Sequence, residues 1–134
     1  GLVMEQLTAL AVQHGFASTL IKPWVDQIRQ KETEKLEKMA AERESAAVPV
    51  NPLRACKEIA DAFGADAIFV GDGGDFVATA ASILKIHEQG HWLDPGPLGT
   101  LGVGPGYAMA AKLAKPDNPV VIVYGDGSFG LHAM

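Results

Sequence analysis

The chain has 134 residues, of which 48% are hydrophobic and 20% charged, and it carries a formal net charge of −5 at pH 7. This is the composition of a globular α/β protein, and the negative charge argues against nucleic acid and anionic membranes as partners. A single cysteine, Cys56, excludes an intrachain disulfide and suits a cytoplasmic location, and no segment resembles a membrane span or a signal peptide.

The N-terminal third predicts two helices. Apolar residues recur at helical spacing over 3–13, and Gly15 follows as a helix end. A long charged helix is predicted from Pro23 through about Ser45, and it suits a connector because most of its surface is polar. Its apolar positions form one narrow stripe expected to be buried: Trp24, Ile28, Leu36 and Met39. Residues 46–50 read as an extended linker at a domain boundary.

A third helix is predicted between Asn51, which is expected to cap it, and Gly64, which is expected to end it. Proline at the first helical position supports this start. Its buried face is predicted from helical spacing: Leu53, Cys56, Ile59, Ala60 and Phe63. Cys56 is therefore expected in the core and not as a nucleophile.

A short apolar strand over 67–70 then runs into a glycine turn at 71–75 (Gly-Asp-Gly-Gly-Asp), and a helix is predicted over about 76–87. Helix, strand, turn and helix form half of a doubly wound unit. Asp72 and Asp75 are candidates to bind a metal or to orient a ligand. Asp75 also stands where an N-cap residue belongs, and the two roles stay open.

Residues 91–97 are predicted as a loop, and a glycine-rich segment at 99–106 leads to a helix over Tyr107–Lys115. So many glycines at one helix entrance imply close approach of the backbone to another segment or to a ligand. The last strand is expected to begin at Val120. Three residues of the preceding helix are expected to face the core: Met109, Ala110 and Leu113.

The last predicted strand opens into Gly-Asp-Gly-Ser at 125–128. Gly125 and Gly127 allow a tight turn, and backbone amides there, including that of Ser128, can hold phosphate oxygens. Asp126 supplies a carboxylate suited to magnesium bridging to a diphosphate. The alternative is an ordinary turn. Since no helix is expected after this turn to cover the sheet, the chain is expected to be a piece of a longer protein.

Two alternative functions rest on single glycine motifs. Residues 102–107 resemble the dinucleotide-binding Gly-x-Gly-x-x-Gly pattern, but the third glycine comes one position early and no clear strand precedes it. Residues 70–75 resemble the late metal motif of haloacid dehalogenase-type phosphatases. That family also needs an Asp-x-Asp nucleophile upstream, which the chain lacks.

Several motifs together resemble the thiamine diphosphate-dependent enzymes. Residues 125–128 resemble the opening of that family's diphosphate–magnesium motif, and 99–104 (Gly-Thr-Leu-Gly-Val-Gly) resemble its Gly-x-(Met/Leu/Ile)-Gly segment. Residues 92–96 (Trp-Leu-Asp-Pro-Gly) and 72–81 are similar to the acetolactate synthase-like branch, which includes 2-hydroxyacyl-CoA lyases. The resemblance covers about 24–134.

The resemblance implies a partial doubly wound parallel sheet preceded by a long connector helix. Residues 1–22 would end a central domain, 23–47 would form the connector and linker, and 48–134 would begin the diphosphate-binding domain. The implied activity is that of a 2-hydroxyacyl-CoA lyase, which yields an aldehyde and formyl-CoA. Two alternatives stay open: an acetolactate synthase-type transferase acting on 2-oxoacids, and a non-catalytic truncated interaction module.

The resemblance also assigns roles to residues. Asp126 would bind Mg²⁺, the Gly99 carbonyl would accept a hydrogen bond from the 4′-amino group, and Leu101 would wedge beneath the bent cofactor unless it is a core leucine. The full set implied to contact thiamine diphosphate is Gly73, Gly74, Asp75, Gly99, Thr100, Leu101, Gly125, Gly127 and Ser128. No catalytic residue is expected in this chain, because the cofactor-activating glutamate would come from another domain, usually in a partner subunit of a homodimer or homotetramer. The isolated chain is therefore expected to be inactive.

Overall fold

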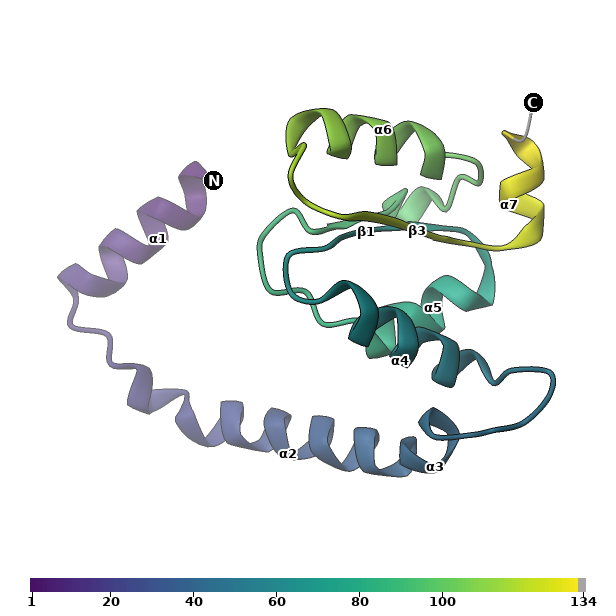
Figure 1. Cartoon of the computed structure of the whole chain (residues 1–134). Coiled ribbons are helices and arrows are strands. Elements are labelled where there is room, and N and C mark those ends of the chain that lie inside the picture. The colour runs from purple at the N-terminus through teal and green to yellow at the C-terminus, as the bar shows by residue number, and fades with distance from the viewer. Residues whose placement is uncertain (133–134) are drawn as a thin grey trace. The chain divides into compact units, whose positions relative to one another are not determined.

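The structure is a computed structural model that describes residues 1–132 (Figure 1). The chain divides into two compact units, Gly1–Ala40 and Ala41–Met134. None of the helices in the described part of the chain is long and apolar enough to cross a membrane. The assignment of the chain to a central domain, a connector and a diphosphate-binding domain stays a prediction.

The first unit is helical and has no buried residue in its helices. The predicted buried stripe is wrong for Trp24 and Ile28, which are 63% and 44% exposed. The predicted charged helix is also too long, since Met39 ends it. No glycine or proline marks that break in the sequence. The elements up to this point are α1 (Leu2–Gln13), η1 (Ser18–Leu20), α2 (Lys22–Lys38) and α3 (Ala40–Arg43).

The second unit is an α/β layer structure. Its three-stranded sheet is parallel, with the order β2-β1-β3. Helix α6 lies on one face of the sheet, and α4 and α5 lie on the other (Figure 1). This arrangement confirms the predicted α/β, partial doubly wound fold. Its elements are α4 (Pro52–Phe63), β1 (Ile68–Asp72), α5 (Gly74–Ile83), β2 (Trp92–Leu93), η2 (Gly96–Leu98), α6 (Gly104–Ala114), β3 (Val120–Tyr124) and α7 (Asp126–Leu131).

The core of this unit surrounds β1, whose five residues are all buried because helices cover both faces of the sheet. Helix α4 begins as predicted: the Asn51 side chain accepts a hydrogen bond from the Leu53 amide at 2.8 Å. It ends at Gly64, where φ is +69°. Cys56 is fully buried, and this burial raises the pKa of its thiol. The prediction of a core cysteine is confirmed.

Three predicted boundaries are wrong. Helix α5 ends at Ile83 and not at His87, because Leu84 turns extended and buries its side chain. Of the two roles left open for Asp75, capping is excluded, because Asp75 lies inside the first turn of α5 and Gly73 occupies the N-cap position. The predicted loop at 91–97 contains strand β2, which pairs with the central strand β1. The pairing of β2 with β1 is a tertiary contact that a local pattern does not reveal.

Helix α6 differs from its prediction in both start and orientation. It begins at Gly104, and the predicted core residues Met109 and Leu113 are 64% and 85% exposed. Gly104 and Ala111 are buried instead. Small residues on the inner face let the helix approach the sheet closely. Helix α7 also follows the final turn, contrary to the expectation that no helix would cover it.

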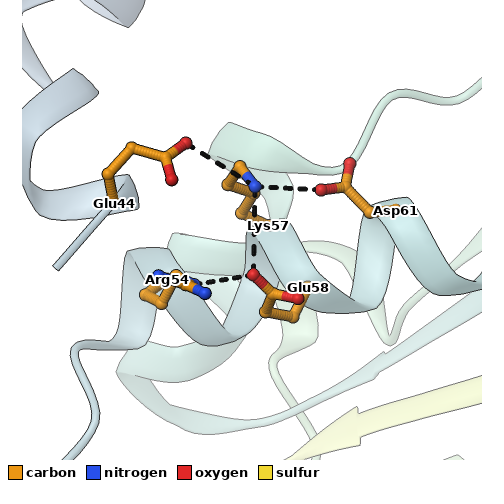
Figure 2. Close-up of polar contacts among 5 residues, drawn as sticks. All are labelled: Glu44, Arg54, Lys57, Glu58 and Asp61. Atoms are coloured by element: carbon orange, nitrogen blue, oxygen red, sulfur yellow. Dashed lines mark hydrogen bonds and ion pairs between the residues drawn. The ribbon is translucent and has the colours of Figure 1, made fainter. Parts of the chain in front are cut away.

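The outer face of α4 carries a cluster of ion pairs centred on Lys57 (Figure 2). Its ammonium lies 3.0 Å from Asp61, 3.6 Å from Glu44 and 3.8 Å from Glu58. The hydrogen bond to Asp61 is the main cause that raises the pKa of Lys57. Arg54 pairs with Glu58 at 2.6 Å. Exposed pairs of this kind contribute little to stability.

Candidate cofactor site

The candidate site lies at the carboxyl ends of β1 and β3. In the parallel register, Asp72 pairs with Tyr124, so the glycine turns that follow the two strands leave the sheet side by side. Open α/β sheets place their ligands at this end of the strands. The two Gly-Asp-Gly turns, which are 54 positions apart in the sequence numbering (126 − 72), therefore share one edge of the fold.

Gly73 is the point where three predicted segments meet. A Cβ built on Gly73 would clash with Cδ2 of Leu101 and with Oγ of Ser128. Ser128 is 3% exposed, and Gly73 has φ of +77°. Glycine is thus required at position 73 both by the backbone conformation and by the closeness of its neighbours. The first turn, the 99–104 segment and the start of α7 therefore meet at Gly73.

Around this meeting point the backbone is open to a ligand. A Cβ added to Gly74, Gly99, Gly125 or Gly127 would meet no atom within 4 Å. The first amides of α7, those of Asp126, Gly127 and Ser128, have no partner inside the helix, as at any helix start. Open backbone and unpaired amides fit a diphosphate group, which needs donors and close approach. Asp75 and Thr100 are both exposed.

Asp126 is exposed in the first turn of α7. Within residues 1–132 no group of three or more His, Cys, Asp or Glu side chains is arranged to hold a metal ion. A single carboxylate suits Mg²⁺ that is held also by phosphate oxygens and water. The donor set of this chain therefore fits a magnesium ion brought with a diphosphate, and it does not form a complete metal cage.

Asp72 does not fill the role of metal or ligand partner that its position suggested. It is fully buried, and its Oδ1 accepts a hydrogen bond from the Gly102 amide at 2.8 Å. Its Oδ2 accepts another from the Gly104 amide, also at 2.8 Å. Both oxygens are turned toward the protein. A phosphatase-type metal site at the first turn would need this aspartate as a ligand, so its burial argues against that interpretation.

The Trp92 loop is held by a local network at the β2 edge. The Trp92 indole donates to Oδ2 of Asp94 at 2.7 Å, and the Gly96 amide donates to Oδ1 of the same carboxylate at 2.7 Å. The Trp92 ring also lies against Gly71, where a Cβ would come within 3.0 Å of Cζ2. The loop therefore packs against the strand that carries the first glycine turn.

The described residues also enclose a cavity of about 280 Å³ beside the start of β1, bordered by Lys57, Asp61, Phe69 and Lys85 among others. None of the predicted cofactor residues lines it. The candidate site is thus separate from this cavity and lies at the carboxyl edge of the sheet.

Comparisons with known proteins agree with these motifs. Residues 72–134 match the family described as "Thiamine pyrophosphate enzyme, C-terminal TPP binding domain". The acetolactate synthase large subunit IlvG of Mycobacterium tuberculosis is 38% identical over 134 residues, which are 100% of this chain and 24% of that protein. The 2-hydroxyacyl-CoA lyase 2 of Caenorhabditis elegans is 40% identical over 134 residues, covering 98% of this chain and 20% of that protein.

The human 2-hydroxyacyl-CoA lyase 2 is 42% identical over 111 residues, which are 80% of this chain and 17% of that protein. The chain therefore spans about a quarter or less of the length of these relatives.

Proposed function

Because the chain belongs to the thiamine pyrophosphate-dependent enzymes, in the branch of acetolactate synthases and 2-hydroxyacyl-CoA lyases, we propose that it forms part of a thiamine diphosphate- and magnesium-dependent carbon–carbon lyase. Its substrate would be a 2-hydroxyacyl-CoA, cleaved to an aldehyde and formyl-CoA. The observation that carries the cofactor assignment is the convergence of Leu101 and Ser128 on Gly73. Three segments that the family motif gives to one cofactor lie at one sheet edge.

Each residue would act on the cofactor by binding and orientation. The Asp126 carboxylate would hold Mg²⁺, and the amides of Gly127 and Ser128 would donate to phosphate oxygens. The Gly99 carbonyl would accept a hydrogen bond from the aminopyrimidine, and Leu101 would support the bent cofactor from below. When bound, thiamine diphosphate supplies the nucleophile and electron sink for carbon–carbon cleavage, and the protein supplies position and electrostatics.

Acetolactate synthase-type chemistry is the second candidate. It is favoured by the 38% identity of the mycobacterial synthase across the whole chain. The lyase reading is favoured by residues 72–81 and the Trp92 loop, and by lyase relatives that match the same span at 40%. Cofactor contacts are the same in both reactions, so they do not separate the two. The difference lies in the substrate that the rest of the protein admits.

The test uses the product of the complete open reading frame that encodes this sequence. We expect formyl-CoA and an aldehyde from a 2-hydroxyacyl-CoA in the presence of thiamine diphosphate and Mg²⁺. Acetolactate from pyruvate would support the second candidate instead. Asp126→Ala should weaken thiamine diphosphate binding at least about tenfold, as even outer partners of a metal cost 10–100-fold. Asp117→Asn, at an exposed carboxylate away from the site, serves as the control of equal charge change.

The 134-residue chain on its own should neither bind the cofactor tightly nor turn over substrate. The proposed reasons are that the activating glutamate comes from a partner subunit and that further magnesium ligands come from another segment. Isothermal calorimetry with thiamine diphosphate and Mg²⁺ checks this. Micromolar, magnesium-dependent binding by the isolated chain would contradict it. A complete gene product that binds no cofactor would favour the interaction-module alternative.

A further inference from the structure

Asp72 links two segments that the chain keeps far apart. Its carboxylate lies at the end of β1, and the two amides it binds are 30 and 32 positions further along the chain. Gly102 directly follows Leu101, and Gly104 comes two residues later, on the short segment that leads from the predicted cofactor residues into α6. Each carboxylate oxygen accepts a hydrogen bond from one of these amides. The 102–104 backbone is therefore held at two points, and it cannot pivot about a single hydrogen bond.

The Gly104 amide is one of the N–H groups that a helix leaves without an internal partner. Asp72 satisfies it from another strand, and a carboxylate at a helix N-terminus is also favoured by the helix dipole. Hydrogen bonds to a carboxylate are stronger than those between neutral groups. Because Asp72 is fully buried, water does not replace it when it is removed.

The contact is close as well as polar. A Cβ at Gly104 would lie 2.8 Å from Oδ2 and 3.0 Å from Cβ of Asp72, and 3.0 Å from Cγ2 of Ile122. Gly102, with φ of +85°, would bring a Cβ within 2.7 Å of the His132 ring. The backbone of residues 102–104 therefore lies directly against β1 and against the end of α7. A side chain at position 102 or 104 would push this backbone away from its neighbours.

We propose that Asp72 is a positioning residue that fixes Leu101 against Gly73 and so sets the geometry of the cofactor-binding edge. It acts through the Gly102 and Gly104 amides and does not itself touch the cofactor or the metal. The inference rests on the proposed function for its consequence in catalysis. The fixation itself is a property of this chain and is measured without any cofactor.

The first test is amide hydrogen exchange by NMR on the 134-residue chain. Asp72→Asn replaces one acceptor oxygen by a donor, so one of the two amides loses its partner. Exchange at the amide that loses its acceptor, Gly102 or Gly104, should accelerate at least about tenfold, as expected for a lost bond to a charged group. The cross-peak between the Leu101 methyls and the Gly73 α-protons should weaken, while exchange in β1 and β3 changes less than about threefold. Unchanged exchange at both glycines, or equal acceleration throughout the unit, would overturn the proposal.

A second variant approaches the same contact from the other side and is independent of whether Asp72→Asn folds. Gly104→Ala should push the 102–104 backbone off Asp72 and weaken the Leu101–Gly73 cross-peak. Gly106→Ala is the matched control in the same helix, since a Cβ there meets nothing within 4 Å. If Gly104→Ala keeps the cross-peak and the exchange rates of the wild type, the fixation does not exist.

The catalytic consequence is tested on the complete gene product. Asp72→Asn should raise the thiamine diphosphate concentration needed for half-maximal activity by about 10–100-fold, which corresponds to one lost charge-assisted bond. Turnover at saturating cofactor should return to within about threefold of the wild type, whereas a merely unfolded fraction would lower turnover at every cofactor concentration. If the wild type binds no thiamine diphosphate, the proposed function fails while the exchange result still decides the fixation.

Discussion

The two Gly-Asp-Gly turns have the same three residues and opposite roles. At the first, Asp72 is buried and both of its oxygens accept backbone hydrogen bonds. At the second, Asp126 is exposed, and within residues 1–132 no hydrogen bond to its carboxylate is found. Asp72 joins two segments of the same chain, whereas the Asp126 carboxylate is free to bind a cation. A motif thus specifies which atoms are present at a sheet edge, while the neighbouring segments decide which of them a ligand can reach.

Replacing each aspartate by alanine should separate the two roles most strongly. Asp72→Ala leaves two buried amides without acceptors, which should lower the free energy of unfolding by about 2–5 kcal/mol. Asp126→Ala should lower it by about 0.5 kcal/mol or less, mainly through the lost helix-dipole interaction. Chemical denaturation of the two variants measures both values. Equal losses would show that the two turns are not functionally distinct.

The glycines that follow the two aspartates extend the comparison to backbone conformation and packing. Gly73→Ala introduces a side chain at positive φ and against Leu101 and Ser128, which should cost about 2–4 kcal/mol. Gly127→Ala in the second turn meets nothing within 4 Å and should change stability by less than about 1 kcal/mol, in either direction. Thermal unfolding of the pair is the measurement. A tolerated alanine at position 73 would mean that the three segments do not meet there.

An aromatic pair packs across the second turn. The rings of Tyr124 and Phe129 are 5.5 Å apart between centroids, at 58°. Phe129→Leu should lower stability by about 0.5–1.5 kcal/mol and loosen α7, which carries Ser128. Leu113→Ala, on the exposed face of α6, is the control and should be near neutral. No effect at Phe129 would show that the aromatic pair does not hold α7 in place.

Magnesium without cofactor should give the smallest effect. One exposed carboxylate binds Mg²⁺ weakly, so about 10 mM MgCl₂ should raise the free energy of unfolding by less than about 0.5 kcal/mol. Denaturation with and without the salt, corrected with an equal ionic strength of NaCl, measures it. A rise above about 1 kcal/mol that Asp126→Asn removes would reveal a further metal ligand within this chain and contradict the proposed need for a diphosphate.

Local signals in the sequence determined much of this molecule. The Asn51 cap, the core position of Cys56 and the strands around 68 and 120 were predictable because capping chemistry and apolar periodicity act over a few residues. The order of strand, glycine turn and helix likewise predicted an α/β fold with a ligand edge at the strand ends. The predicted set of cofactor residues follows from motif spacing and stays a prediction.

Tertiary structure alone decided the rest. Strand β2 exists because β1 offers an unpaired edge, and α6 turns Ala111 inward because only small side chains fit against the sheet. The role of Asp72 depends on two amides 30 and 32 positions away, a distance over which a single sequence carries no pairing signal. The same tripeptide, Gly-Asp-Gly, therefore has a buried aspartate that binds backbone amides in one turn and an exposed aspartate in the other. What separated them was whether a second backbone segment crosses the turn and takes up the acceptor oxygens.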